Sequence, residues 1–211
     1  MDISSLEKKI NNLFLEKKYN EVVKLTEKST IPNKLPASMT NIIGISKILK
    51  KNRTEDDVSS SLELFKETFI NGGQSVHSLN GLIHLITISI QFTSKYKYLS
   101  KFVYLAENYY RTAEKNFANN ERFLTSGLDL FSYLLKFNEV QKIYEKLLLL
   151  GKTSKSSVCS FLFNNNYFSR FSQKDHFETA KMYNKYFPKL NVQKLIKKDF
   201  NPDIKINIGF V

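Results

Sequence analysis

The residues of this sequence that could carry out chemistry include three histidines. His77 and His84 lie seven positions apart in one apolar segment. On a helix that separation is about 10 Å, which is too far for the two rings to share one metal ion directly. His176 lies far from both along the chain. We therefore expect structural or surface roles for the histidines.

The single cysteine, Cys159, has no second thiol with which to form a disulfide inside the chain. No histidine or other base stands beside it in the sequence, so we predict a buried, small apolar side chain and not a nucleophile. One cysteine in 211 residues also fits a reducing compartment. We take the cytoplasm as the location.

Motifs of known enzyme classes do not occur in the sequence: it has no P-loop, no G-x-G-x-x-G, no H-E-x-x-H and no G-x-S-x-G. Gly72 and Gly73 indicate a turn. The acidic run Glu55, Asp56 and Asp57 is explained by a helix start, where the helix dipole favours carboxylates. The sequence thus assigns no catalytic, no cofactor-binding and no metal-ligating residue.

The chain is basic, with 32 Lys and Arg against 20 Asp and Glu and a formal charge of +12. Such an excess could serve a nucleic acid or an anionic membrane. Most of the basic residues are lysines that stand beside acidic residues, as in "FLEKKYNEVVKLTEK", which favours solvated helix faces. We predict no nucleic-acid and no membrane partner. An RNA-binding helical repeat stays an alternative and would need its Lys and Arg on one face.

The elements that must position these residues are helices. Only 7 Gly and 4 Pro interrupt the chain, and apolar residues recur at the spacing of amphipathic helices. Thr54, followed by Asp57 three positions on, has the spacing of a capping box. The pattern predicts four pairs of helices, over 3–31, 38–71, 75–117 and 121–150.

Two of these pairs share a local sequence. "KKYNEVVKL" near the start and "LKFNEVQKI" further on carry aromatic-Asn-Glu-Val at the opening of a second helix. Gly44, Gly81 and Gly127 lie in the middle of three first helices, where a small residue lets paired helices approach closely. The pattern resembles the tetratricopeptide repeat, a helix-turn-helix unit of about 34 residues. This resemblance implies an all-α, tetratricopeptide-like helical-hairpin solenoid of about ten or eleven helices.

The end of the chain resembles a known join between domains. "FLFNNNYFSRFSQKDHFETAKMYNKYFPKL" followed by "KINIGFV" is similar to the region where repeats meet the catalytic region in O-linked N-acetylglucosamine transferases and SPINDLY-like glycosyltransferases. Asn166 and Tyr167 match the end of one helix, and Ser172 to Phe177 match the capped start of the next. Lys205 to Val211 match the first catalytic strand. The alternation in "NPDIKINIGFV" also predicts a short C-terminal β-strand by itself.

The resemblance implies three regions: degenerate repeats over 1–151, a helical joining region over 152–200, and the first strand of a truncated catalytic domain over 201–211. A parent enzyme would use a nucleotide sugar such as a UDP-sugar, but no position here matches the catalytic or sugar-binding residues of the family. We predict that the chain presents an acceptor or partner protein, held in a concave groove, to a catalytic domain that it does not include. The alternative is a free-standing scaffold for protein–protein interaction. The sugar, the acceptor and the oligomeric state stay open.

Many such transferases hold the acceptor backbone with an Asn two residues before the glycine of the first helix. The corresponding positions here are Ile42, Leu79 and Thr125. Asn41 and Asn80 lie one residue to either side of that register. We therefore expect structural roles for both asparagines.

Overall fold

A computed structural model describes residues 3–28 and 35–152, together with isolated positions between 159 and 181. Contacts divide the chain into two compact units, Met1–Thr153 and Ser154–Val211. The described residues of the first unit form helices and turns, which confirms the predicted all-α class for this part of the chain. The strand predicted over 201–211 lies outside the described residues.

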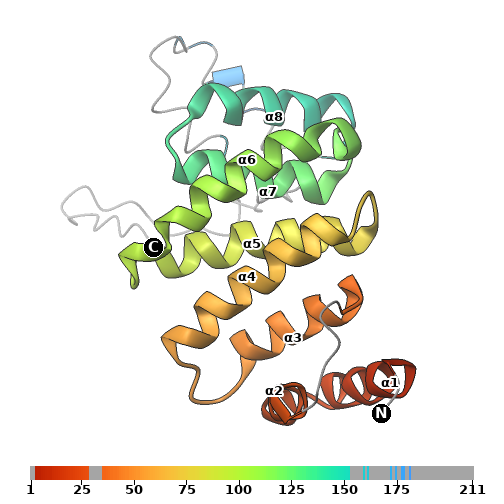
Figure 1. Ribbon diagram of the computed structural model, residues 1–211. Coiled ribbons are helices and arrows are strands. Elements are labelled where there is room, and N and C mark those ends of the chain that lie inside the picture. Colours follow the sequence, from red (N-terminus) through yellow and green to blue (C-terminus); the bar gives the residue numbers. More distant parts are fainter. Residues whose placement is uncertain are drawn as a thin grey trace, which may run out of the picture. The chain divides into compact units, whose positions relative to one another are not determined.

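Eight α-helices and one 3-10 helix follow one another along the described part of the chain (Figure 1). The first four pairs predicted from the sequence correspond to four helical hairpins; the further helices that we predict fall mostly outside the described residues. The hairpins are α1 (Ile3–Leu15) with α2 (Tyr19–Lys28), α3 (Ala37–Leu49) with α4 (Glu55–Asn71), α5 (Val76–Thr93) with α6 (Ser100–Phe117), and α7 (Glu121–Tyr133) with α8 (Phe137–Leu149). The 3-10 helix η1 (Lys97–Leu99) joins α5 to α6.

The first helices of successive hairpins contact one another. In the first unit α1 contacts α3, α3 contacts α5, and α5 contacts α7. The second helix of each hairpin also packs on the first helix of the next, as α4 does on α5. Figure 1 shows α3, α4 and α5 following one another in this way. The central helix α5 is therefore held by α3, α4, α6 and α7.

The predicted start and end of α4 are confirmed. The hydroxyl of Thr54 accepts a hydrogen bond from the amide of Asp57 at 3.2 Å, and a carboxylate oxygen of Asp57 accepts one from the amide of Thr54 at 2.8 Å. These two bonds form a capping box. The helix ends at Asn71, and Gly73 has a φ of +57°, the left-handed conformation that glycine adopts at little cost.

The two segments that share aromatic-Asn-Glu-Val form the same turn. Lys17 and Leu135 occupy the same place in it, with φ values of 57° and 56°. The turn amides donate to carbonyls three and five residues back: Lys17 to Phe14 and Lys18 to Leu13 in the first hairpin, Leu135 to Ser132 and Lys136 to Phe131 in the fourth. The helices that precede the two turns have 13 residues each. The internal similarity predicted from the sequence is therefore a similarity of backbone structure.

Leu135 holds a left-handed conformation that glycine adopts more easily. Its side chain is 71% exposed, so little packing would be lost with it. We expect Leu135→Gly to raise the free energy of unfolding by about 0.5–1 kcal/mol, measured by urea denaturation. Leu149→Gly is the matched control, because Leu149 is 88% exposed but helical, and it should destabilise the protein. A loss of stability in both variants would contradict the prediction.

The three central glycines do allow close helix contacts, but two of the neighbours differ from the prediction. Only Gly44 faces the second helix of its own hairpin. Gly81 faces α4 and Gly127 faces α6, which in each case is the second helix of the preceding hairpin. A Cβ atom would lie 2.6 Å from the Phe65 ring at Gly44 and 2.8 Å from Thr68 Cβ at Gly81, and at Gly127 it would overlap Tyr110.

Candidate functional site

The two histidines predicted to share a helix both lie on α5. His77 is exposed, whereas His84 is half-buried with its ring centroid 5.2 Å from that of Phe65. Burial, together with the positive charge of Arg122, lowers the pKa of His84 below its ordinary value. His84 is therefore neutral at pH 7 and packs as an aromatic ring. Among the described residues, no group of His, Cys, Asp and Glu side chains is arranged to hold a metal ion.

Our prediction of a buried Cys159 is wrong, because its side chain is exposed. Cys159 and Phe161 are both helical, and Phe161 is the buried residue of the two. Residues two positions apart point to nearly opposite sides of a helix, so burying Phe161 turns Cys159 toward solvent. Exposure alone does not make this thiol a nucleophile, since no base is placed beside it in the described residues.

The acidic run at 55–57 has the structural role that we predicted. All three carboxylates lie in the first turn of α4. Asp57 is buried and caps the helix, and it also pairs at 2.6 Å with Lys50, the residue that follows α3. The cluster therefore stabilises a helix start and the turn before it.

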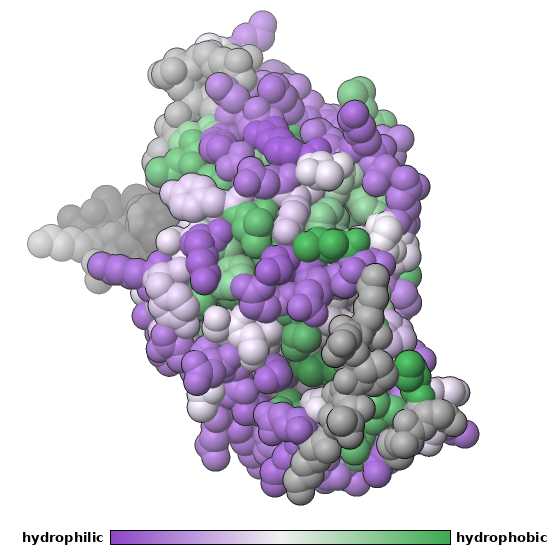
Figure 2. Space-filling model, in the orientation of Figure 1, coloured by the Kyte–Doolittle hydropathy of each residue, from purple (hydrophilic) through white to green (hydrophobic). Residues whose placement is uncertain are grey.

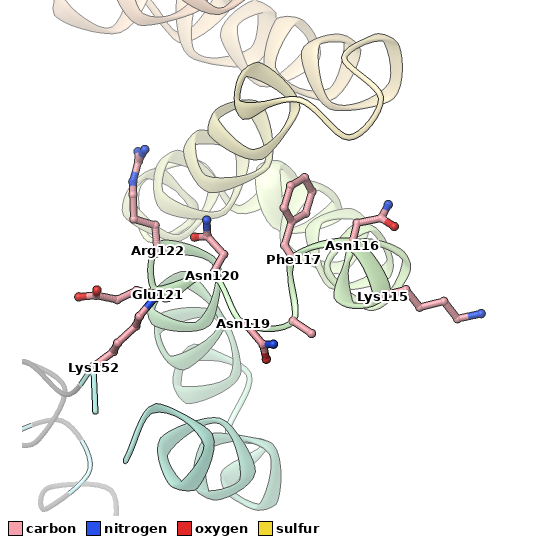
Figure 3. Close-up of a pocket in the computed structure, with 9 residues that line it drawn as sticks. Lys115, Asn116, Phe117, Asn119, Asn120, Glu121, Arg122 and Lys152 are labelled. Atoms are coloured by element: carbon pink, nitrogen blue, oxygen red, sulfur yellow. The ribbon is translucent and has the colours of Figure 1, made fainter. Parts of the chain in front are cut away.

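A pocket of about 490 Å³ lies at the turn between α6 and α7 (Figure 3). Its basic residues include Lys115, Arg122 and Lys152, and Glu121 lies among them. Figure 3 shows Lys115 and Arg122 pointing away from each other, so their charges do not converge on one point. A diphosphate needs several donors aimed at the same oxygens. The pocket therefore does not fit a nucleotide sugar.

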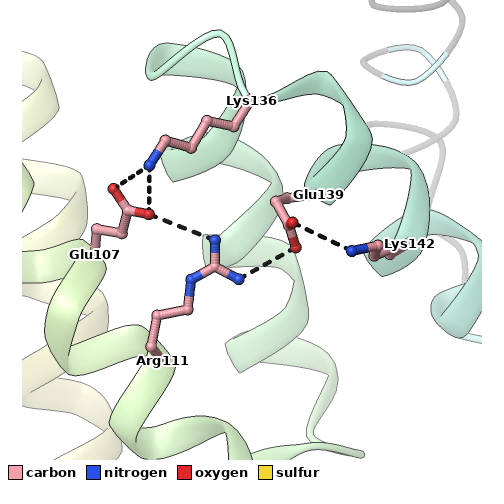
Figure 4. Close-up of polar contacts among 5 residues, drawn as sticks. All are labelled: Glu107, Arg111, Lys136, Glu139 and Lys142. Atoms are coloured by element: carbon pink, nitrogen blue, oxygen red, sulfur yellow. Dashed lines mark hydrogen bonds and ion pairs between the residues drawn. The ribbon is translucent and has the colours of Figure 1, made fainter.

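A chain of alternating charges joins the third hairpin to the fourth (Figure 4). Glu107 on α6 accepts from Lys136 Nζ at 2.6 and 2.7 Å, and it also pairs with Arg111 at 3.4 Å. Arg111 in turn contacts Glu139 on α8 at 3.2 Å, and Glu139 accepts from Lys142 at 3.3 Å. The Arg111 guanidinium also lies over an aromatic ring of α7.

These five residues hold helices together, and each of them is already engaged in an ion pair. Glu107 and Glu139 each have two cationic partners. Burial acts to raise the pKa of Glu139, but its hydrogen bonds with Arg111 and Lys142 outweigh this and lower the pKa. Lys136, Glu139 and Lys142 are the counterparts of Lys18, Glu21 and Lys24 in the repeated sequence. The residues that the two repeated segments share thus stabilise the packing of the fourth hairpin.

The remaining open surface of the first helices is a separate feature. We call it the first-helix face, and define it by the exposed and half-buried side chains that recur every three or four positions on α3, α5 and α7. They are Ser38, Ile42, Ile45 and Leu49 on α3; Asn80, His84, Thr87 and Gln91 on α5; and Arg122, Thr125 and Asp129 on α7. This spacing places each set on one side of its helix.

The first-helix face changes in character from one helix to the next. On α3 it is mostly isoleucine and leucine, and it is partly covered, because Ser38 donates to Glu7 of α1 and Ile42 packs on the core of the first helices. On α5 it is uncharged, because this helix of 18 residues contains no Asp, Glu, Lys or Arg. On α7 it carries two opposite charges, Arg122 and Asp129. By contrast, the side of the molecule on which α6 crosses in front of α7 is mostly hydrophilic, with hydrophobic residues in separate patches (Figure 2).

The structural roles that we expected for the two asparagines stay predictions. Asn41 is 6% exposed and Asn80 is half-buried, and the side-chain oxygens of both are buried without a hydrogen-bond donor among the described residues. Leu79, in the register of the peptide-binding asparagine, is itself buried. Sequence reasoning missed Arg122 and Asp129, although their separation of two helical turns could have indicated a shared face.

Comparisons with known proteins assign the chain to no family. No family model matches it, and neither the curated proteins nor the solved structures yield a significant match. None of the helices in the described part combines the length and the apolar character needed to cross a bilayer.

Proposed function

We propose that residues 3–152 form a helical-hairpin repeat scaffold that binds a segment of a partner protein along the first-helix face. The observation that carries this proposal is the uncharged open side of α5. A helix surface that serves only to face water normally carries charged residues. An open surface of isoleucine, threonine and amide side chains instead suits a protein segment, which offers apolar groups and backbone hydrogen bonds.

The packing supports a solenoid arrangement of the four hairpins. Each first helix contacts the next first helix, and the first and fourth hairpins repeat the same turn, as expected for stacked copies of one unit. In the aligned repeat, Ser5 and Lys9 of α1 stand where α7 has Phe123 and Gly127. The outer face of α1 is therefore polar where that of α7 is apolar, which is typical of a terminal repeat.

A selection experiment tests whether the first-helix face binds protein segments. The probe is a phage-displayed library of random peptides of about 16 residues, long enough for four helical turns. We expect the full chain to enrich peptides whose binding falls at least about tenfold with Thr87→Arg, which places a charge in the middle of the face. Thr112→Arg makes the same change on an exposed position of α6 and should leave binding unaltered. Equal binding to both variants would refute the proposal.

A more specific role follows from the sequence alone. We propose that the scaffold presents an acceptor protein for sugar transfer, and the support for this is the resemblance of the segment from 158 to 211 to the repeat–catalytic join of glycosyltransferases. That segment lies outside the described residues except for isolated positions. Coding sequence beyond residue 211 that lacked a nucleotide-sugar-binding lobe would refute this role and leave the scaffold proposal intact.

A further inference from the structure

Arg122 and Asp129 are the charged residues of the first-helix face, and neither has an ion pair or hydrogen bond within the described residues. They lie seven positions apart on α7, which places them on one side of the helix about 10.5 Å from each other along its axis. Each of the five charged residues shown in Figure 4 is paired with another of the five. Arg122 and Asp129 are free to pair with a bound partner.

The surroundings of the two side chains differ. Arg122 is close enough to His84 of α5 to affect its titration, so its charge acts across the α5–α7 contact. Figure 3 shows its guanidinium extending away from the other residues of the α6–α7 turn. Asp129 is reached by solvent, yet the protein around it removes hydration from the carboxylate and raises its pKa.

The open side of α5 also carries a row of apolar residues, with the same seven-residue spacing as Arg122 and Asp129. Val76, Ile83 and Ile90 are exposed or half-buried and are spaced seven positions apart. Two packed helices contact each other at two positions in every seven residues, and Asn80 and Thr87, exposed or half-buried between these three residues, supply the second set. Charged residues beside such a seam pair across the contact. An extended chain would not keep this period, because its side chains alternate every second residue.

Resting on the proposed function, we propose that the segment bound to the first-helix face is an amphipathic α-helix. Its apolar side packs on α5, and an acidic and a basic residue seven positions apart pair with Arg122 and Asp129 respectively. Since the two charges of α7 differ in sign, only one direction of the bound helix brings opposite charges together. The pair therefore sets the orientation and selectivity of binding more than its strength.

The test repeats the peptide selection on the full chain with a charge-swap variant, Arg122→Glu combined with Asp129→Lys. Wild-type protein should enrich peptides that carry an acidic and a basic residue seven positions apart. Peptides selected on the wild type should bind the swap variant at least about tenfold more weakly, the effect of roughly one lost ion pair replaced by repulsion. Selection on the swap variant should enrich the opposite order of charges.

Two further variants make the result specific. Glu114→Lys with Lys115→Glu swaps exposed charges on α6 and should not change the selected peptides. Arg122→Gln with Asp129→Asn removes the charges without adding new ones, which covers the case in which the swap variant fails to fold. It should weaken binding and abolish the preference for charge order.

The two proposals fail in different ways. Peptides that lose binding with Thr87→Arg but respond neither to the swap nor to the neutral variant would overturn the helix-pairing inference and leave the scaffold proposal standing. Enriched peptides with charges two or four positions apart would also overturn it, in favour of an extended segment. Failure to enrich any peptide sensitive to Thr87→Arg would overturn both.

Discussion

Replacing Gly127 by alanine should lower the free energy of unfolding by about 3 kcal/mol, although alanine is the better helix former. The added methyl group would occupy the space of the Tyr110 hydroxyl and ring. Tyr110 cannot move aside, because it is 2% exposed, stacks on Phe123 at 4.1 Å and meets Phe131 edge-on at 5.2 Å. The overlap must therefore push α7 away from α6. Urea denaturation followed by circular dichroism measures the loss.

A double-mutant cycle separates this clash from other effects. Tyr110→Leu alone should destabilise the protein by leaving a cavity, but it should remove most of the additional cost of Gly127→Ala. Thr125→Ala, two positions earlier on the same helix and half-buried, should change stability little. If the costs of Gly127→Ala and Tyr110→Leu simply add, the contact between the two residues is not the cause.

The helix pairs were predictable because their signals are local. Helical periodicity, the Thr54–Asp57 cap and the Gly72–Gly73 stop each act within a few residues, and the structure places α4 between them. The repeated turn was also predictable, since aromatic-Asn-Glu-Val comes after a residue of the same left-handed backbone conformation, Lys17 in one copy and Leu135 in the other. The helices that contact Gly81 and Gly127 could not be predicted from the sequence. The stacking of the hairpins decides which helix lies beside each glycine.

The candidate site was harder to predict for the same reason. Arg122 and Glu139 are both charged residues at ordinary positions of amphipathic helices. Only the structure shows that Arg111 of α6 forms an ion pair with Glu139 of α8, whereas no acidic side chain pairs with Arg122 among the described residues. Cys159 was wrongly predicted to be buried for a similar reason. Its exposure depends on the burial of the neighbouring Phe161 and not on its own residue type. Charge becomes informative about function once the paired residues have been set aside.

Replacing Asp57 by alanine should cost about 3 kcal/mol at pH 7, because it breaks a largely buried ion pair and a helix cap together. One carboxylate oxygen lies 2.6 Å from Lys50 Nζ, and the other accepts from the amide and the hydroxyl of Thr54 at 2.8 and 2.7 Å. The side chains are only 7% and 18% exposed for Asp57 and Lys50. Without the carboxylate, the ammonium of Lys50 would stay half-enclosed and unpaired.

The pH dependence of this loss identifies its source. Burial acts to raise the pKa of Asp57, but the hydrogen bonds from Lys50 and Thr54 outweigh it and hold the pKa below its ordinary value. Because the folded pKa is lower than the unfolded one, the stabilisation is complete above the unfolded value of about 3.9 and is lost as the pH falls through the folded value. The difference in unfolding free energy between wild type and Asp57→Ala should thus be constant from pH 7 to 5 and shrink toward pH 3. Lys50→Met with Asp57→Asn, which removes both charges and keeps a capping oxygen, should be more stable than Asp57→Ala and should lack that pH dependence. A difference that stayed constant down to pH 3 would show that cavity formation, and not the ionised carboxylate, causes the loss.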